Sequence, residues 1–170
     1  MNKVFVEEKH LYKIDCRKAV WATDKVHEAY HNNKVSLLKD VDFIIEREEE
    51  IVLLEYKNGN NPQAIAHGVV FKPESEKVIN SIAEKYFDTL HYLNLLGKNK
   101  PKHYVWVLEY PHGSSVARKL IRNKIIKQLP FRLQADLSDK IKIIESFEVL
   151  SIAEWNDRYG EYQISKLEEK

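Results

Sequence analysis

Hydrophobic residues are densest between Asp40 and Asn61, where two apolar segments flank a run of charged residues. The segments are Val41–Arg47 and Glu50–Tyr56, and both are rich in Val, Ile, Leu or Phe over a length typical of strands. Apolar residues occupy both faces of each segment, so both faces must be covered by other parts of the chain. The pattern predicts a buried β-hairpin around which the rest of the fold is organised.

The register of this hairpin follows from where its turn lies. An even-length turn at the middle of the charged run places Ile44 opposite Leu53 and Asp42 opposite Glu55. Side chains alternate between the two faces of a strand, so Lys57 lies on the same face as Glu55. Three ionisable side chains therefore gather where an otherwise apolar face ends. An odd-length loop would move Asp42 to a diagonal position, still within reach of a shared metal ion.

The remaining sequence alternates between helical and extended patterns. Helices are predicted at Arg17–His31 with a restart at Thr23 or Asp24, between Ser75 and Gly97, from Ser114 or Ser115 through Lys127, and after the Ser151–Glu154 capping box. Extended segments are predicted at Lys3–Cys16, at His103–Tyr110 and at Lys140–Leu150, with a stop at Asn58–Pro62 after the hairpin. This order predicts an α/β sandwich with a mixed sheet flanked by helices.

Composition limits the class of protein. A chain of 170 residues with 44% hydrophobic and 31% charged residues is expected to fold as one globular domain, residues 1–170. The single cysteine, Cys16, excludes an internal disulfide and fits a reducing compartment. The N-terminal residues lack an apolar core of signal-peptide length, and no apolar run approaches a membrane span. We therefore expect a cytoplasmic protein without a membrane partner.

Charge is unevenly distributed along the chain despite a net charge of only +1. The segment Gly97–Ala135 holds nine basic residues and one acidic residue, Glu109, which leaves a net charge of −7 for the rest of the chain. Such segregation favours a basic surface that binds nucleic acid through its phosphates, although solvated helix faces would give the same pattern. The candidate contacts lie in the basic helix and are Arg118, Lys119, Arg122 and Lys124.

The end of the hairpin has the chemistry of a metal site. Asp42 and Glu55 are expected side by side in a poorly solvated place, where their repulsion raises a pKa unless a cation intervenes. Lys57 is one available cation, and a bound divalent ion is the other. Carboxylate and carbonyl oxygens are hard ligands that suit Mg²⁺ or Mn²⁺. The arrangement favours a metal-dependent phosphodiesterase.

An Asp at the start of one strand, followed by Glu-x-Lys in the next, resembles the PD-(D/E)XK nuclease superfamily. The likeness is carried by Val41-Asp42-Phe43-Ile44-Ile45 and Leu53-Leu54-Glu55-Tyr56-Lys57, and the surrounding text is similar to small uncharacterised bacterial members. It covers roughly residues 17–110. Val41 stands where the nominal motif has proline. The resemblance implies a restriction-endonuclease-like three-layer sandwich.

The resemblance also implies roles for particular residues. Asp42 and Glu55 would bind Mg²⁺ or Mn²⁺, with the Tyr56 carbonyl as a third ligand. Lys57 would position or deprotonate the attacking water, and Glu28 in the preceding helix loosely matches a further catalytic acid. The expected activity is hydrolysis of DNA by a magnesium-dependent nuclease that works alone or as a homodimer.

Three alternatives remain open at this point. The fold could belong to a catalytically silent member that binds nucleic acid or protein. Asp42, Glu55 and Lys57 could also be ordinary cross-strand ion pairs at the end of a sheet. Finally, His27-Glu28-Ala29-Tyr30-His31 matches H-E-x-x-H, which would make the protein a zinc metalloprotease with both histidines on one helical face.

Overall fold

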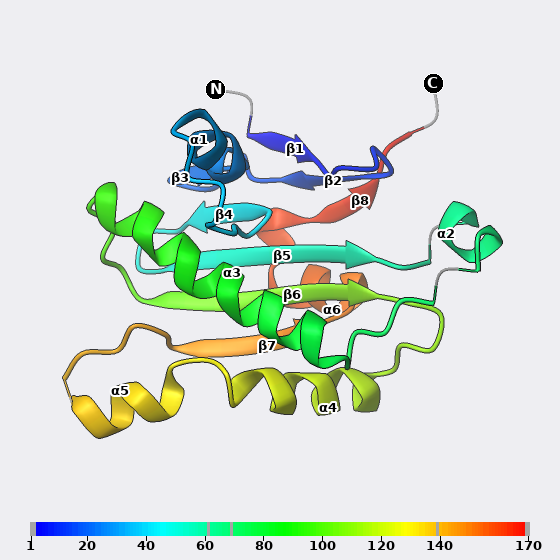
Figure 1. Ribbon diagram of the computed structural model, residues 1–170. Helices are drawn as coiled ribbons and strands as arrows, with labels where there is room; N and C mark the ends of the chain where they lie inside the picture. The colour runs from blue at the N-terminus through cyan, green and yellow to red at the C-terminus, as the bar shows by residue number, and fades with distance from the viewer. Residues whose placement is uncertain (1–2, 61, 69, 139, 169–170) are drawn as a thin grey trace.

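A mixed five-stranded sheet forms the centre of the computed structural model, which describes residues 3–60, 62–68, 70–138 and 140–168 (Figure 1). In spatial order its strands are β3 (Trp21–Thr23), β4 (Phe43–Glu46), β5 (Ile51–Asn58), β6 (Lys102–Glu109) and β7 (Ser146–Leu150). The first three strands are antiparallel, and β6 and β7 continue parallel to β5. The predicted mixed sheet is therefore confirmed.

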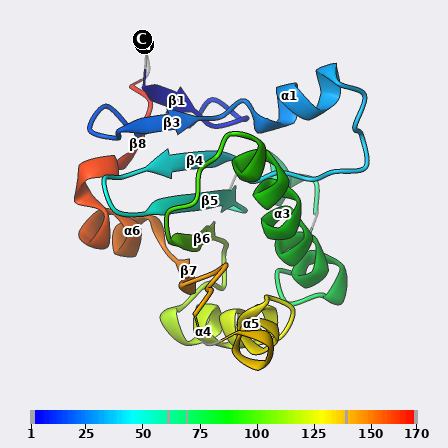
Figure 2. The ribbon, with the colours of Figure 1, turned by 90° about the vertical axis from the view of Figure 1, so that its left-hand side faces the viewer.

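A second, smaller sheet joins the two ends of the described chain. Its strands are β1 (Val4–Val6), β2 (Tyr12–Asp15) and β8 (Ile164–Lys166), all antiparallel in the order β1-β2-β8. Both ribbon views place this sheet beside the β3–β4 edge of the large sheet (Figures 1 and 2). The hairpin formed by β1 and β2 agrees with the extended segment predicted for Lys3–Cys16.

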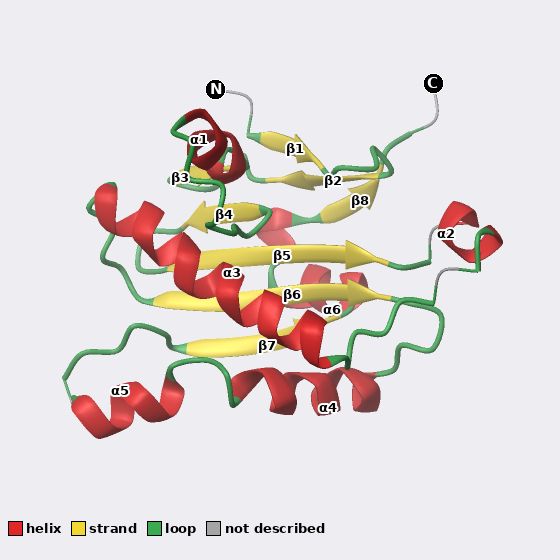
Figure 3. Cartoon of the chain, in the orientation of Figure 1, coloured by secondary structure: helices red, strands yellow, loops and turns green. Residues whose placement is uncertain are grey.

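Helices cover both faces of the large sheet (Figures 2 and 3). The helices of the described residues are α1 (Val26–Asn32), α2 (Pro62–Ala66), α3 (Glu76–Leu95), α4 (Ser115–Ile126), α5 (Phe131–Leu137) and α6 (Ile152–Arg158), with a 3-10 turn at Gly160–Tyr162. The long helix α3 crosses one face, and α6 lies on the other (Figure 2). No helix in the described ranges is long and apolar enough to cross a bilayer.

The central strand β5 is buried on both faces, as its sequence predicts. Leu53 packs in a core with Tyr86 of α3, whereas Leu54 packs in a second core with Trp155 of α6. Both leucines are fully inaccessible to solvent. Alternate residues of one strand thus hold two layers of the molecule against the sheet.

The predicted hairpin register is confirmed. Ile44 pairs with Leu53, and Phe43 pairs with Leu54. Because β4 begins at Phe43, continuing this register by one pair places Asp42 opposite Glu55. The hydrophobic pattern and an even-length turn were sufficient to align these strands.

Helix ends follow their capping residues. The side chains of Ser75, Ser114 and Ser151 each cap the helix that follows, and Ser151 and Glu154 form the complete predicted capping box. Gly97 has a φ of 66°, the left-handed conformation in which glycine ends a helix. The predicted stop after β5 includes Asn61, which lies outside the described residues.

Two predicted elements have different bounds in the structure. Residues Trp21–Thr23 form strand β3 and not the first half of a helix, because they pair along the backbone of β4. Pairing with a neighbouring strand outweighed a helical pattern of apolar residues, so helix α1 begins only at Val26. In the segment predicted as a strand from Lys140, pairing with β6 begins at Ser146.

Leu53→Ala is expected to lower the free energy of unfolding by about 2–5 kcal/mol, because it opens a cavity in a fully buried layer. Urea denaturation followed by circular dichroism measures the loss. Leu95, which is 88% exposed, provides the control, and Leu95→Ala is expected to change stability by less than about 0.5 kcal/mol. Equal losses in the two variants would contradict the two-sided burial of β5.

Candidate functional site

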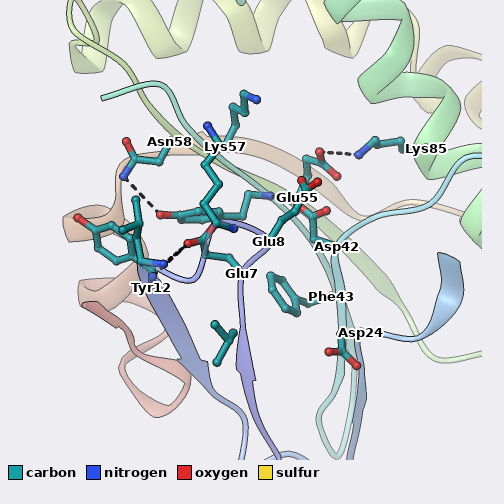
Figure 4. Close-up of a pocket in the computed structure, with 14 residues that line it drawn as sticks. Glu7, Glu8, Tyr12, Asp24, Asp42, Phe43, Glu55, Lys57, Asn58 and Lys85 are labelled. Atoms are coloured by element: carbon teal, nitrogen blue, oxygen red, sulfur yellow. Dashed lines mark hydrogen bonds and ion pairs between the residues drawn. The ribbon is translucent and has the colours of Figure 1, made fainter. Parts of the chain in front are cut away.

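Asp42 and Glu55 meet where β4 begins and β5 approaches its end (Figure 4). Oδ2 of Asp42 accepts a hydrogen bond from the backbone N–H of Tyr56 at 2.8 Å. This bond fixes the Asp42 carboxylate across the end of the strand pair. The side chain of Glu55 is only 9% exposed. The structure therefore brings together the two carboxylates that the hairpin register predicts.

The partner of Glu55 comes from helix α3. Nζ of Lys85 lies 2.7 Å from Oε1 of Glu55 (Figure 4). The second oxygen, Oε2, is buried and has no hydrogen-bond partner among the described residues. A buried carboxylate oxygen without a donor is costly, so a further ligand at this atom would be stabilising.

Lys85 was missed by sequence reasoning, although the sequence carries a signal for it. Ile82 and Thr89 are buried on the face of α3 that packs against the sheet, and Lys85 lies three residues after one and four before the other. Residues at this spacing share a helical face. A lysine within the buried stripe of a helix requires an acidic partner, and here that partner is Glu55.

Burial controls the ionisation of the site. Burial raises the pKa of Asp42, although the charge of Lys85 and the bond from Tyr56 oppose the rise. Burial, followed by the charge of Asp42, raises the pKa of Glu55 to about 8 and outweighs the Lys85 ammonium. For Lys85 itself, burial lowers the pKa, but the charges of Glu55 and Asp42 prevail and raise it. One ammonium is too little positive charge for the buried Glu55 and the half-buried Asp42 together.

Lys57 lines the same pocket but does not contact the carboxylates. It is exposed, and its ammonium lies over the ring of Phe71, 5.6 Å from the centroid. The ion pair expected between Lys57 and Glu55 is taken by Lys85. A catalytic role for Lys57 stays a prediction that depends on its moving toward a substrate.

Tyr56 connects the site to the opposite face of the sheet. Its amide binds Asp42, while its ring packs near Tyr12, with 6.1 Å between the ring centroids. The proposed use of its carbonyl as a metal ligand stays a prediction.

The carboxylates open into a pocket of about 330 Å³. Much of its wall comes from the β1–β2 hairpin, including Glu7, Glu8 and Lys9, and another part comes from Asp24. Sequence reasoning did not place the hairpin here, because only the folded arrangement of the two sheets brings it over the end of β5. The first segment of the chain thus contributes to the site that the central hairpin defines.

Glu28 lies outside this pocket. It is exposed on α1 and pairs with Lys25 at 3.2 Å. Asp24, which precedes the same helix, lines the pocket instead. The structure therefore does not place Glu28 with Asp42, and its predicted catalytic role has no support in the geometry.

The histidines of the H-E-x-x-H match lie on the surface of α1. His27 contacts Oδ1 of Asp40 at 3.1 Å, and its ring stacks on that of His31 with centroids 6.4 Å apart. Within residues 3–60, 62–68, 70–138 and 140–168, no three His, Cys, Asp or Glu side chains stand ready to hold one metal ion. A zinc site at these histidines therefore has no third ligand in place.

Half of the predicted nucleic-acid contacts serve the fold. Arg118 is buried and pairs with Glu154 at 3.2 Å, and Nε of Arg122 donates to the carbonyl of Phe147 at 2.8 Å. Lys119 and Lys124, in contrast, are exposed on α4. Lys119 and Lys124 are therefore the residues of this helix that are best placed to contact a phosphate.

The chain matches no protein-family model, no curated protein and no solved structure in the comparisons.

The raised pKa of Glu55 predicts a pH dependence of stability in the metal-free protein. A carboxyl with a raised pKa contributes its full stability below its unfolded pKa of about 4.5 and loses it as the pH rises through about 8. Relative to the wild type, Glu55→Gln is expected to gain up to about 1.4 kcal/mol per pH unit between these values.

Urea unfolding at several pH values with EDTA measures this difference. The control is Glu48→Gln in the exposed β4–β5 turn, for which no such trend is expected. A stability difference for Glu55→Gln that stays constant from pH 5 to pH 8 would show that Glu55 ionises normally in the fold.

Proposed function

We propose that this protein is a metal-dependent phosphodiesterase of the PD-(D/E)XK type that hydrolyses DNA. The observation that carries the proposal is the buried oxygen Oε2 of Glu55, which has no partner in the described structure and lies beside Asp42. A carboxylate pair in such a place is stable in its ionised form only with additional positive charge. A divalent cation supplies that charge and would turn the pocket into a site for phosphate.

The order of elements supports a restriction-endonuclease-like arrangement as part of the proposal. An antiparallel hairpin, β4 and β5, is followed by the long helix α3 and by β6, which is parallel to β5. The acidic residues lie at the same end of this hairpin, where β5 runs toward solvent. This position at the exposed end of the hairpin supports the proposal that Asp42 and Glu55 form the acidic part of such a motif.

The residues present fit Mg²⁺ or Mn²⁺. Asp42 and Glu55 would hold the ion through carboxylate oxygens, which are the ligands these ions prefer, and the Tyr56 carbonyl would be the third ligand. A bound ion would stabilise negative charge on the phosphate and lower the pKa of a coordinated water. Asp42 is already oriented for this role by the Tyr56 amide.

The two lysines of the pocket, Lys85 and Lys57, would have different roles. Lys85 holds Glu55 in place through its 2.7 Å contact and would offset part of the charge of the pair. Lys57, at the exposed rim of the pocket, is free to turn from Phe71 toward a bound phosphodiester and position the attacking water. We assign orientation of the carboxylate to Lys85 and contact with the substrate to Lys57.

A catalytically silent binding protein is the second candidate. It is favoured by the same contact between Lys85 and Glu55, because this ion pair already gives Glu55 a structural counter-ion. In that case the pocket would have no catalytic role. Nucleic acid would bind instead to exposed basic residues of α4.

Asp42→Asn and Glu55→Gln are each expected to reduce DNA cleavage by at least about 100-fold, because each removes a charged ligand of the proposed ion. The assay incubates plasmid, single-stranded and branched DNA with Mg²⁺ or Mn²⁺. Glu48→Gln, which changes an exposed acid of the β4–β5 turn, should cleave as the wild type does.

Lys57→Ala tests the assignment of the substrate contact and is expected to reduce cleavage while leaving Mn²⁺ affinity unchanged. If the wild type cleaves none of these substrates, or if Asp42→Asn cleaves as well as the wild type, the enzymatic proposal fails. Binding without cleavage would favour the silent alternative.

Replacing both Lys119 and Lys124 by Ala is expected to weaken DNA binding and to reduce the slope of log K against log salt concentration by about 2, since each phosphate contact contributes about 0.9. Fluorescence anisotropy with a labelled duplex measures both quantities. The paired change Lys140→Ala and Lys142→Ala, at exposed lysines beyond α5, is the charge-matched control. An equal slope in both double variants would place the DNA elsewhere.

A further inference from the structure

We propose that Glu8, at the tip of the β1–β2 hairpin, is an additional carboxylate ligand of the divalent ion, so that ion binding fastens the small sheet onto the large one. This inference rests on the proposed function and specifies how its site is completed. Glu8 lines the pocket that holds Asp42 and Glu55. In the close-up, its side chain points toward these two residues (Figure 4).

The turn itself explains why Glu8 has this direction. The carboxylate of the preceding residue, Glu7, accepts hydrogen bonds from the amides of Lys9 at 2.8 Å, Leu11 at 2.6 Å and Tyr12 at 3.2 Å. The Glu7 carboxylate therefore stabilises the turn of the hairpin through these hydrogen bonds. Glu8 is exposed, and it makes no hydrogen bond or ion pair with any residue that the structure describes.

A free carboxylate directed at two others is unfavourable unless a cation is shared among them. Burial is the main cause that raises the pKa of Asp42, and the charge of Glu8 adds to the effect. Glu8 and Asp42 line the same pocket, yet Glu8 forms no ion pair with the basic residues of the described structure. Its present position increases the electrostatic cost of the site.

A second observation, the unpartnered oxygen of Glu55, points to a ligand in this pocket. The Glu55 side chain is 9% exposed, it lines the pocket, and its Oε2 has no hydrogen-bond partner among the described residues. With Asp42, Glu55 and Glu8 ionised and Lys85 protonated, the four groups carry a net charge of −2. A single divalent cation neutralises this charge.

Glu8 has to move to complete the site. Among the described residues, three carboxylates are not yet arranged around one point. Glu8 is on an exposed hairpin tip, whereas Asp42 and Glu55 are fixed by the hydrogen bond from Tyr56 and by Lys85. Movement of the hairpin tip therefore costs less free energy than movement of Asp42 or Glu55. Ion binding would draw the hairpin toward the end of β5 and reduce its local opening.

The test uses Mn²⁺ alone as the probe, with the full-length protein and no nucleic acid. Isothermal titration calorimetry is expected to show that Glu8→Gln weakens Mn²⁺ binding by about tenfold or more, since an isosteric neutral side chain is a poor ligand. Glu48→Gln, an exposed acid far from the pocket lining, should bind Mn²⁺ as the wild type does. The exposed position of Glu8 makes its variant safe for folding.

Hydrogen exchange provides a second measurement that does not depend on a variant. Adding Mn²⁺ to the wild type is expected to slow amide exchange in residues 7–12, and this protection should be lost in Glu8→Gln. If the wild type binds Mn²⁺ but Glu8→Gln binds it equally and residues 7–12 gain no protection, the inference is overturned while the proposed function stands. If the wild type binds no Mn²⁺, the result contradicts both the role of Glu8 and the proposed metal-dependent function.

Discussion

The burial of Glu55 beside Asp42 is the constraint on which the rest of the site depends. Removing two carboxylates from water costs several kcal/mol for each ion unless other groups compensate. The fold compensates in part, with the Tyr56 amide on Asp42 and the Lys85 ammonium on Glu55. These contacts join β4, β5 and α3 at one point. We propose that a bound cation supplies the positive charge that these two contacts leave lacking.

The basic residues that cluster in the segment Gly97–Ala135 do not all lie on one exposed surface. Lys98 and Lys100 both pair with the buried carboxylate of Glu46, at the end of the hairpin opposite to the candidate site. Arg118 is likewise held by Glu154. Three of the cations that suggested a nucleic-acid surface are therefore paired with acidic residues of the fold, two of them with the buried Glu46. The exposed lysines of α4, together with Lys127 and Arg132, remain available to a polyanion.

The hydrophobic pattern of the sequence was sufficient to predict the hairpin and its register. It was not sufficient to predict which residues from distant segments line the pocket. Two apolar strands and an even-length turn placed Asp42 opposite Glu55, and this register is confirmed. Lys85 and Glu8 reach the pocket from a distant helix and a separate sheet. The spacing within α3 places Lys85 on a buried face, but only the fold shows that its partner is Glu55 and that Glu8 lies nearby. Residues 21–23 have a helical pattern but form a strand, because β4 offers them backbone partners.

The central claim is that Asp42 and Glu55 form the binding site of a divalent cation. A crystal of the protein soaked in Mn²⁺, measured at a wavelength where manganese scatters anomalously, tests it most directly. The account predicts an anomalous peak within coordination distance of both carboxylates, with Glu8 turned toward it. A pocket without a peak, together with a peak between His27 and His31, would contradict the account and move the metal chemistry to helix α1.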